Sequence, residues 1–264
     1  MRARSLRGAS WRGITAGLLA VVVLLPAAIT PARATVGVDS IKRIGVKAFS
    51  LFLQARDGDL TEQQIFEALQ EFVTVVGEAE DAIMAHLDAL ASAPWVGAAE
   101  HAILEVPTLP VLTEDTLQDY ALEVALHARQ ARRVFDAVDS EVEADHLGFA
   151  IYSLYSVGLE ARVAAGIGTS TYMPNYREAM QAIVDRLKPR CTSREGELDY
   201  HPSIYHVVHE CSTPHGLRTF QDYQVDGEWR EGPWTRPALE AAAGAGTSWE
   251  LAKDQLQRMT DGGV

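Results

Sequence analysis

Apolar residues recur at alternating steps of four and three residues in two segments of the chain. The first segment comprises Ile65, Leu69, Phe72, Val76, Ala79 and Ile83, after which the register slips to Leu87 and Leu90. The second comprises Leu117, Ala121, Val124, Ala128, Ala131, Phe135 and Val138. This spacing collects apolar side chains on one face of an α-helix. Three heptads are too few for an isolated rod, so both segments are predicted to pack within a helical bundle.

Helix start signals precede these segments and several others. Capping boxes are predicted from Thr61 with Gln64, Ser140 with Glu143 and Thr247 with Glu250. Thr113 is also placed to cap a helix, with two acidic residues after it that face the positive helix end. Further helices are predicted over residues 39–56, 94–105 and 174–188, with the last helix of the chain ending near residue 259.

One predicted helix differs from the others in having no polar face. Residues 147–159 contain no charged side chain, and only Glu160 and Arg162 interrupt the run before Tyr176. A helix that is apolar on all sides is either the buried centre of a bundle or a membrane segment. Residues 147–168 are therefore the segment that would insert if the protein acted on a bilayer.

The sequence changes character after residue 189, where turn residues and aromatic residues become more frequent. Residues 203–211 are predicted to form a strand, and Asp226-Gly227 is typical of a tight hairpin between residues 219–225 and 228–231. The predicted fold class is mainly α. It consists of an antiparallel bundle of five or six helices over residues 35–189 and a small disulfide-closed α+β unit over residues 190–264.

The N-terminus has the features of a secretory signal peptide over residues 1–34. A basic start precedes an uncharged run over residues 14–25, and Ala32-Arg33-Ala34 fits the small-x-small cleavage pattern, with Ala34 as the last residue removed. Twelve helical residues rise only about 18 Å, which is too short for a hydrocarbon core of about 30 Å. The mature protein is therefore predicted to begin at Thr35 and to be secreted.

Removal of this segment changes the electrostatic balance. Because residues 1–34 hold five arginines and no acidic residue, the mature chain would have 18 basic and 36 acidic residues, a formal charge of −18 instead of −13. A field of that sign opposes binding to nucleic acid or to an anionic membrane surface. Cys191 and Cys211, the two cysteines of the chain, are expected to form a disulfide in an oxidising compartment.

The densest group of candidate ligand residues is His201, His206, His209 and His215. Imidazole side chains are the ligands that zinc and similar divalent ions prefer, so this group is a candidate metal site. On a strand, however, His206 and His209 point to opposite faces, and only His209 and Cys211 share a side. A metal site would therefore need His201 or His215 to fold back from the loops. The alternative is a set of solvated loop histidines.

Two weaker signals concern the helices. Glu143 with His146 has the Glu-x-x-His spacing of carboxylate metal centres in helical bundles, and Glu123 with His127 could face the same way. A dinuclear centre needs two such elements, and this chain has one. The many acidic residues around positions 136–145 are more simply interpreted as a solvated turn between helices.

The C-terminal aromatic residues are candidates for binding. Trp229, Trp234 and Tyr223 belong to an aromatic group of the kind that is enriched at interfaces, although a small unit also needs large side chains for its core. The sequence contains no Gly-x-Ser-x-Gly elbow, His-Glu-x-x-His motif or phosphate-binding glycine loop.

These observations favour a secreted, non-enzymatic binding protein without a cofactor, whose partner is an extracellular protein or carbohydrate and not nucleic acid. The first alternative is a membrane-acting helical protein of the pore-forming kind. The second is a metal-dependent hydrolase that uses the histidines between His201 and His215.

Overall fold

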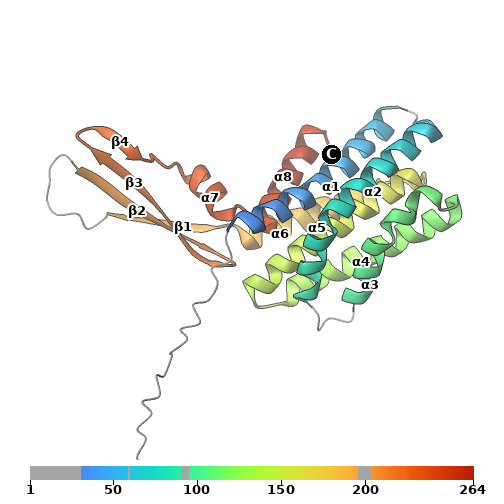
Figure 1. Cartoon of the computed structure of the whole chain (residues 1–264), viewed down its shortest axis with the longest axis horizontal. Coiled ribbons are helices and arrows are strands. Elements are labelled where there is room, and N and C mark those ends of the chain that lie inside the picture. Colours follow the sequence, from blue (N-terminus) through green and yellow to red (C-terminus); the bar gives the residue numbers. More distant parts are fainter. Residues whose placement is uncertain (1–30, 59, 91–94, 196–203) are drawn as a thin grey trace, which may run out of the picture. The chain divides into compact units, whose positions relative to one another are not determined.

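The computed structural model describes residues 31–58, 60–90, 95–195 and 204–264, and within them the chain is mainly α-helical with one antiparallel sheet (Figure 1). The helices are α1 (Pro31–Asp57), α2 (Glu62–Asp88), α3 (Val96–Leu104), the 3-10 helix η1 (Val106–Val111), α4 (Glu114–Ala137), α5 (Glu141–Ala164), α6 (Tyr172–Leu187), α7 (Arg236–Gly244) and α8 (Ser248–Asp261). The strands are β1 (Arg190–Glu195), β2 (Ile204–Thr213), β3 (Gly216–Val225) and β4 (Glu228–Glu231). The predicted fold class is confirmed.

Helix α5 lies at the centre of the bundle. It contacts α1, α2, α3, α4, α6 and α8, and every residue from Leu147 to Val163 is buried. Its apolar character on all sides therefore reflects enclosure by other helices. Among the described residues, no helix is long and apolar enough to cross a membrane.

The two heptad patterns form the faces that the sequence predicts. In α2 and α4 the repeated apolar positions from Leu69 to Leu87 and from Leu117 to Phe135 are buried in the main core. The Thr61–Gln64 capping box is present in full. Thr113 and Ser140 also accept hydrogen bonds from backbone N–H groups in the first turns of α4 and α5. Local capping and the apolar pattern thus specify the same helices.

The cap of α8 differs from the prediction. Thr247 is the N-cap residue, but its hydroxyl donates to the carbonyl oxygen of Gly244, and Glu250 accepts from the backbone of Gly246. The predicted capping box of Thr247 with Glu250 is therefore wrong. The N-terminus of α8 receives its acceptor from another helix, as described below.

The four strands form one antiparallel sheet in the order β1-β2-β3-β4. Cys191 and Cys211 are directly opposite each other on β1 and β2 and form the predicted disulfide. The disulfide packs with Leu239 and Ala243 of α7, which lies against β1 and β2. A cross-link over a loop of this length stabilises a chain by about 3 kcal/mol in the chain-entropy model.

The predicted Asp226-Gly227 turn is also present, because both residues adopt the positive φ that a tight hairpin requires. Two elements of this region were not predicted. Strand β1 has no alternating pattern of apolar residues that would predict it, because only Cys191 of its six residues is buried. Helix α7 is short, and Pro237 in its first turn resembles a loop signal although proline suits that position. The last helix, α8, packs against α1, α5 and α6.

Candidate functional site

Helix α5 carries a buried carboxylate near each end. Asp145, in its second turn, has an exposed fraction of 0%, and Glu160, in the turn before its last, has an exposed fraction of 1%. Removing a carboxylate from water is costly unless partners replace the lost hydrogen bonds. The partners of these two residues therefore decide what each can do.

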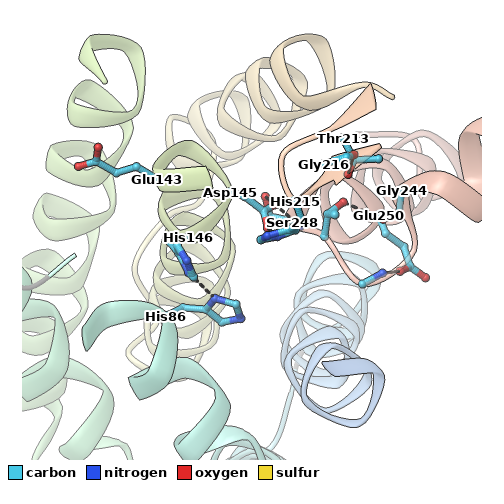
Figure 2. Close-up of polar contacts among 12 residues, drawn as sticks. His86, Glu143, Asp145, His146, Thr213, His215, Gly216, Gly244, Ser248 and Glu250 are labelled. Atoms are coloured by element: carbon cyan, nitrogen blue, oxygen red, sulfur yellow. Dashed lines mark hydrogen bonds and ion pairs between the residues drawn. The ribbon is translucent and has the colours of Figure 1, made fainter. Parts of the chain in front are cut away.

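Asp145 is fully partnered (Figure 2). Its Oδ1 accepts hydrogen bonds from the backbone nitrogen and the hydroxyl of Ser248, both at 2.8 Å, and its Oδ2 lies 2.8 Å from Nε2 of His215. Ser248 is the first residue of α8, so Asp145 supplies the acceptor that Thr247 does not. Gly148 makes this approach feasible, because a Cβ there would overlap the side chain of Ser248.

Asp145 thereby joins three parts of the molecule. His215 lies in the turn between β2 and β3, and its hydrogen bond to Asp145 raises its pKa above the ordinary histidine value. A protonated His215 would form a charge-assisted hydrogen bond with the carboxylate. The arrangement ties the sheet and α8 to the first half of α5. The interpretation of this connection as a solvated turn is wrong for Asp145, although Glu143 is exposed.

Two further histidines lie beside this group. Nδ1 of His86 on α2 is 2.9 Å from Nδ1 of His146, and the His86 ring stacks on Phe149 with centroids 3.8 Å apart. Burial lowers the pKa of His86 to about 4, helped by the neighbouring His146, and burial also lowers the pKa of His146. The rings of His146 and His215 meet edge-on at 6.4 Å.

The cluster of His86, His146 and His215 with Asp145 and Ser248 does not form a catalytic triad. Ser248 donates its hydroxyl hydrogen to Asp145 and not to a histidine, so it is not activated by a base as a nucleophile must be. Among the described residues, no group of three or more histidine, cysteine, aspartate or glutamate side chains is placed to hold a metal ion. The contacts of this cluster hold α2, α5, α8 and the sheet together.

Glu160 has a different environment. It lies with α1 and α2 around a cavity of about 200 Å³, and no described residue donates a hydrogen bond to its buried Oε2. The other lining residues are Lys47, Ser50, Leu51, Gln54, Gln64, Glu67, Ala68 and Glu71. Burial raises the pKa of Glu160 to about 8, Glu71 adds to the rise, and Lys47 opposes it.

The mouth of this cavity carries charge. Nζ of Lys47 is 2.6 Å from Oε2 of Glu71, and this contact lowers the pKa of Glu71. Both side chains are exposed, so their ion pair contributes little to stability. A buried acid with a strongly shifted pKa beside a concave cavity is typical of a functional site.

The four predicted metal-ligand histidines have separate surroundings where the structure describes them. His206 pairs with Gln221, His215 pairs with Asp145, and His201 lies outside the described residues. His209 is buried on the same side of β2 as Cys211, with Nδ1 2.7 Å from Oγ of Ser193 and Nε2 3.1 Å from Asp222. The latter contact is close enough for an ion pair but is not aligned as a hydrogen bond. His206, His209 and His215 thus do not share partners.

The candidate metal ligands on the helices also do not converge on one point. His127 contacts Glu123 and Gln130 on its own helix. His146 contacts His86, and Glu143 points away from both histidines in Figure 2. The predicted Glu-x-x-His pair therefore does not converge.

The three candidate binding aromatics occupy different environments. Trp229 is exposed, with an edge-to-face contact to Tyr205 at 5.7 Å, and the two flank Gln224 on one face of the sheet. Trp234 packs on Phe220 beside the disulfide. Tyr223 is adjacent to Gln224 on β3 and so points to the opposite face, where it contacts His206.

Sequence reasoning missed the role of Glu160, Asp145 and His86. The available signal for Glu160 was that it is the first charge after a thirteen-residue uncharged run, a position that predicts a buried acid. Of the predicted signal peptide, residues 1–30 lie outside the described part of the chain, and Ala34 lies within α1.

Comparison of the chain with protein family models, with curated proteins and with solved structures found no match.

Proposed function

We propose that this chain is an exported, non-enzymatic binding protein whose ligand site is the cavity between α1, α2 and α5. The observation that carries the proposal concerns Glu160, which lines the cavity and whose buried Oε2 has no hydrogen-bond partner among the described residues. A buried polar atom without a partner destabilises the free protein by about 1–3 kcal/mol. A ligand with a suitable donor removes that cost, so binding is favoured at this atom.

The lining residues support recognition better than catalysis. Among the described lining residues, one carries a hydroxyl, Ser50, and that oxygen accepts a hydrogen bond from Gln54 on its own helix. No base among the described lining residues is hydrogen bonded to it. Export is supported by the signal-peptide pattern and by the disulfide, which indicates an oxidising compartment.

The proposal is tested by thermal unfolding in the presence of a library of small amines, sugars and carboxylic acids. A ligand at one hundred times its Kd stabilises the folded state by about 2.7 kcal/mol. We expect at least one compound to stabilise the mature protein and to lose this effect in Ala68→Met, which fills the cavity. A library without such a compound would contradict the proposal.

A second candidate is recognition of an extracellular protein or carbohydrate by the sheet. It rests on the exposed pair of Tyr205 and Trp229, with exposed fractions of 48% and 42%, since such aromatic side chains are enriched where partners bind. Trp229→Ala should abolish capture of that partner while Glu228→Ala, its exposed neighbour, does not. Equal capture by both variants would exclude this surface.

A further inference from the structure

The charges around Glu160 indicate the kind of ligand that the cavity accepts. Glu67 and Glu71 line it, and the single cation among the described lining residues is Lys47, which is already paired with Glu71. Glu67 accepts a hydrogen bond from the neutral side chain of Gln63 and has no cation paired with it in the described residues. The cavity therefore carries excess negative charge, within a chain of formal charge −13, and such a site concentrates cations.

Other ligand classes fit less well. An anion would meet the acidic side chains of Glu67 and Glu71 and a lysine that is already paired with Glu71. A metal ion needs three or more convergent ligands, and no group of that kind is present among the described residues. The volume of about 200 Å³ is also below the range of about 300–1,000 Å³ that holds drug-sized molecules. The ligand should therefore be small, cationic and equipped with an N–H group for Oε2 of Glu160.

We propose that the cavity binds a small primary or secondary organic amine, whose ammonium group donates to Glu160 at the buried end and to Glu71 or Glu67 at the mouth. This inference rests on the proposed function and adds the chemical class of the ligand. Because the ion pair of Lys47 with Glu71 is exposed and weak, an incoming ammonium group can share Glu71 at little cost.

Binding is coupled to the release of a proton. In the free protein the Glu160 carboxyl is protonated at neutral pH, since its pKa is raised to about 8. The ammonium ion favours the ionised carboxylate, so the carboxyl O–H bond breaks, its proton passes to the solvent, and the N–H group donates to the oxygen that remains. The charged groups that line the cavity are Lys47 from α1 and Glu67 and Glu71 from α2. None of these needs to change its protonation state.

Isothermal titration calorimetry of the mature protein with 1,4-diaminobutane tests both parts of the inference. Repeating the titration at pH 7 in buffers of different ionisation enthalpy measures the protons released. A group with a pKa of about 8 is about nine-tenths protonated at pH 7, so we expect nearly one proton per bound amine. Glu160→Gln should abolish this release and weaken binding at least tenfold.

The controls distinguish the loss of any acidic side chain from the loss of the one that lines the cavity. Glu78→Gln removes an acid of α2, the helix that carries Glu67 and Glu71. Glu78 pairs with Arg43 and does not line the cavity, so this variant should bind the amine like the wild type. The probes 1,4-butanediol and succinate match the amine in length without its charge. Unchanged amine binding by Glu160→Gln, or binding without proton release, would overturn the inference.

The same titrations distinguish a cavity that binds another class of ligand from a cavity that binds none. If the diol or succinate binds and Ala68→Met prevents it, the cavity is a ligand site and its proposed chemistry is wrong. If neither the amine nor any compound of the library binds in a way that depends on Ala68, both proposals fail.

Discussion

The two buried carboxylates of α5 lie fifteen residues apart on one helix and are accommodated in opposite ways. Asp145 receives three polar contacts from Ser248 and His215, whereas Oε2 of Glu160 receives none from the described residues. A buried acid with all its partners supplied by the chain holds elements together. A buried acid beside a cavity and without a partner can receive a donor from outside. The difference assigns a structural role to one and a binding role to the other.

The largest effect is expected from Asp145→Ala. The variant leaves the buried backbone N–H and hydroxyl of Ser248 without their acceptor, and it also removes the carboxylate partner of the more exposed His215 ring. Each buried donor left without an acceptor costs about 1–3 kcal/mol, so losing the acceptor of both Ser248 donors costs about 3–5 kcal/mol. Urea unfolding at pH 6 measures the loss. Asp139→Ala removes an exposed acid from the same connection and is the control, expected to change stability by less than about 0.5 kcal/mol. Equal losses in the two variants would remove the structural role of Asp145.

The second effect is the change with pH in the stability that Glu160 contributes to the folded protein. Its pKa is about 8 in the folded protein against an ordinary value of 4.5, so between these limits the folded state binds more protons than the unfolded state. Stability from this group is therefore full below about pH 4.5 and is lost as the pH rises to about 8. Each pKa unit corresponds to about 1.4 kcal/mol.

Glu160→Gln isolates this contribution, because glutamine has a similar shape and does not titrate. Relative to the variant, the wild type should lose about 2–3 kcal/mol between pH 5 and pH 7. Urea unfolding of both proteins at the two pH values measures the difference. A difference that does not change with pH would mean that burial does not raise the pKa of Glu160, and the contrast between the two acids would disappear.

The sequence was informative about the elements and poor about these two sites, for a physical reason. Heptad spacing and capping residues are local patterns, and they predict α2, α4 and the start of α5 correctly. The partners of Asp145 lie 70 and 103 residues away, and no local pattern encodes such contacts. The proposed role of Glu160 depends on a cavity between three helices. Such a cavity arises where side chains from distant parts of the sequence leave space unfilled, and no local pattern encodes it. The disulfide was predictable because the chain has two cysteines in all.

The third effect is the loss of folding stability as the pH falls below 7, the acid limb of the stability profile. We expect protonation of His86 to cause it. Its folded pKa of about 4 lies below the ordinary value of 6.5, so its contribution is present above about pH 6.5 and is lost as the pH falls towards 4. In the Glu160→Gln background, replacing His86 with Gln should remove about 1–2 kcal/mol of the change between pH 7 and pH 5. The same unfolding measurement reports it. An unchanged acid limb would show that His86 does not resist protonation and that the Asp145 end of α5 is open to water.

The smallest expected loss of stability comes from removing one of the three donors to Asp145, the hydroxyl of Ser248. Ser248→Ala removes the hydroxyl that donates to Oδ1 and keeps the backbone N–H of the same residue on that oxygen. Since the carboxylate retains two of its three contacts, the expected loss in urea unfolding is about 1 kcal/mol, well below that of Asp145→Ala. Combining Ser248→Ala with Asp145→Ala should then add nothing, because the hydroxyl has no acceptor left to lose. An additive double variant would mean that Ser248 stabilises α8 independently of Asp145, and that the network at this end of α5 is looser than its distances indicate.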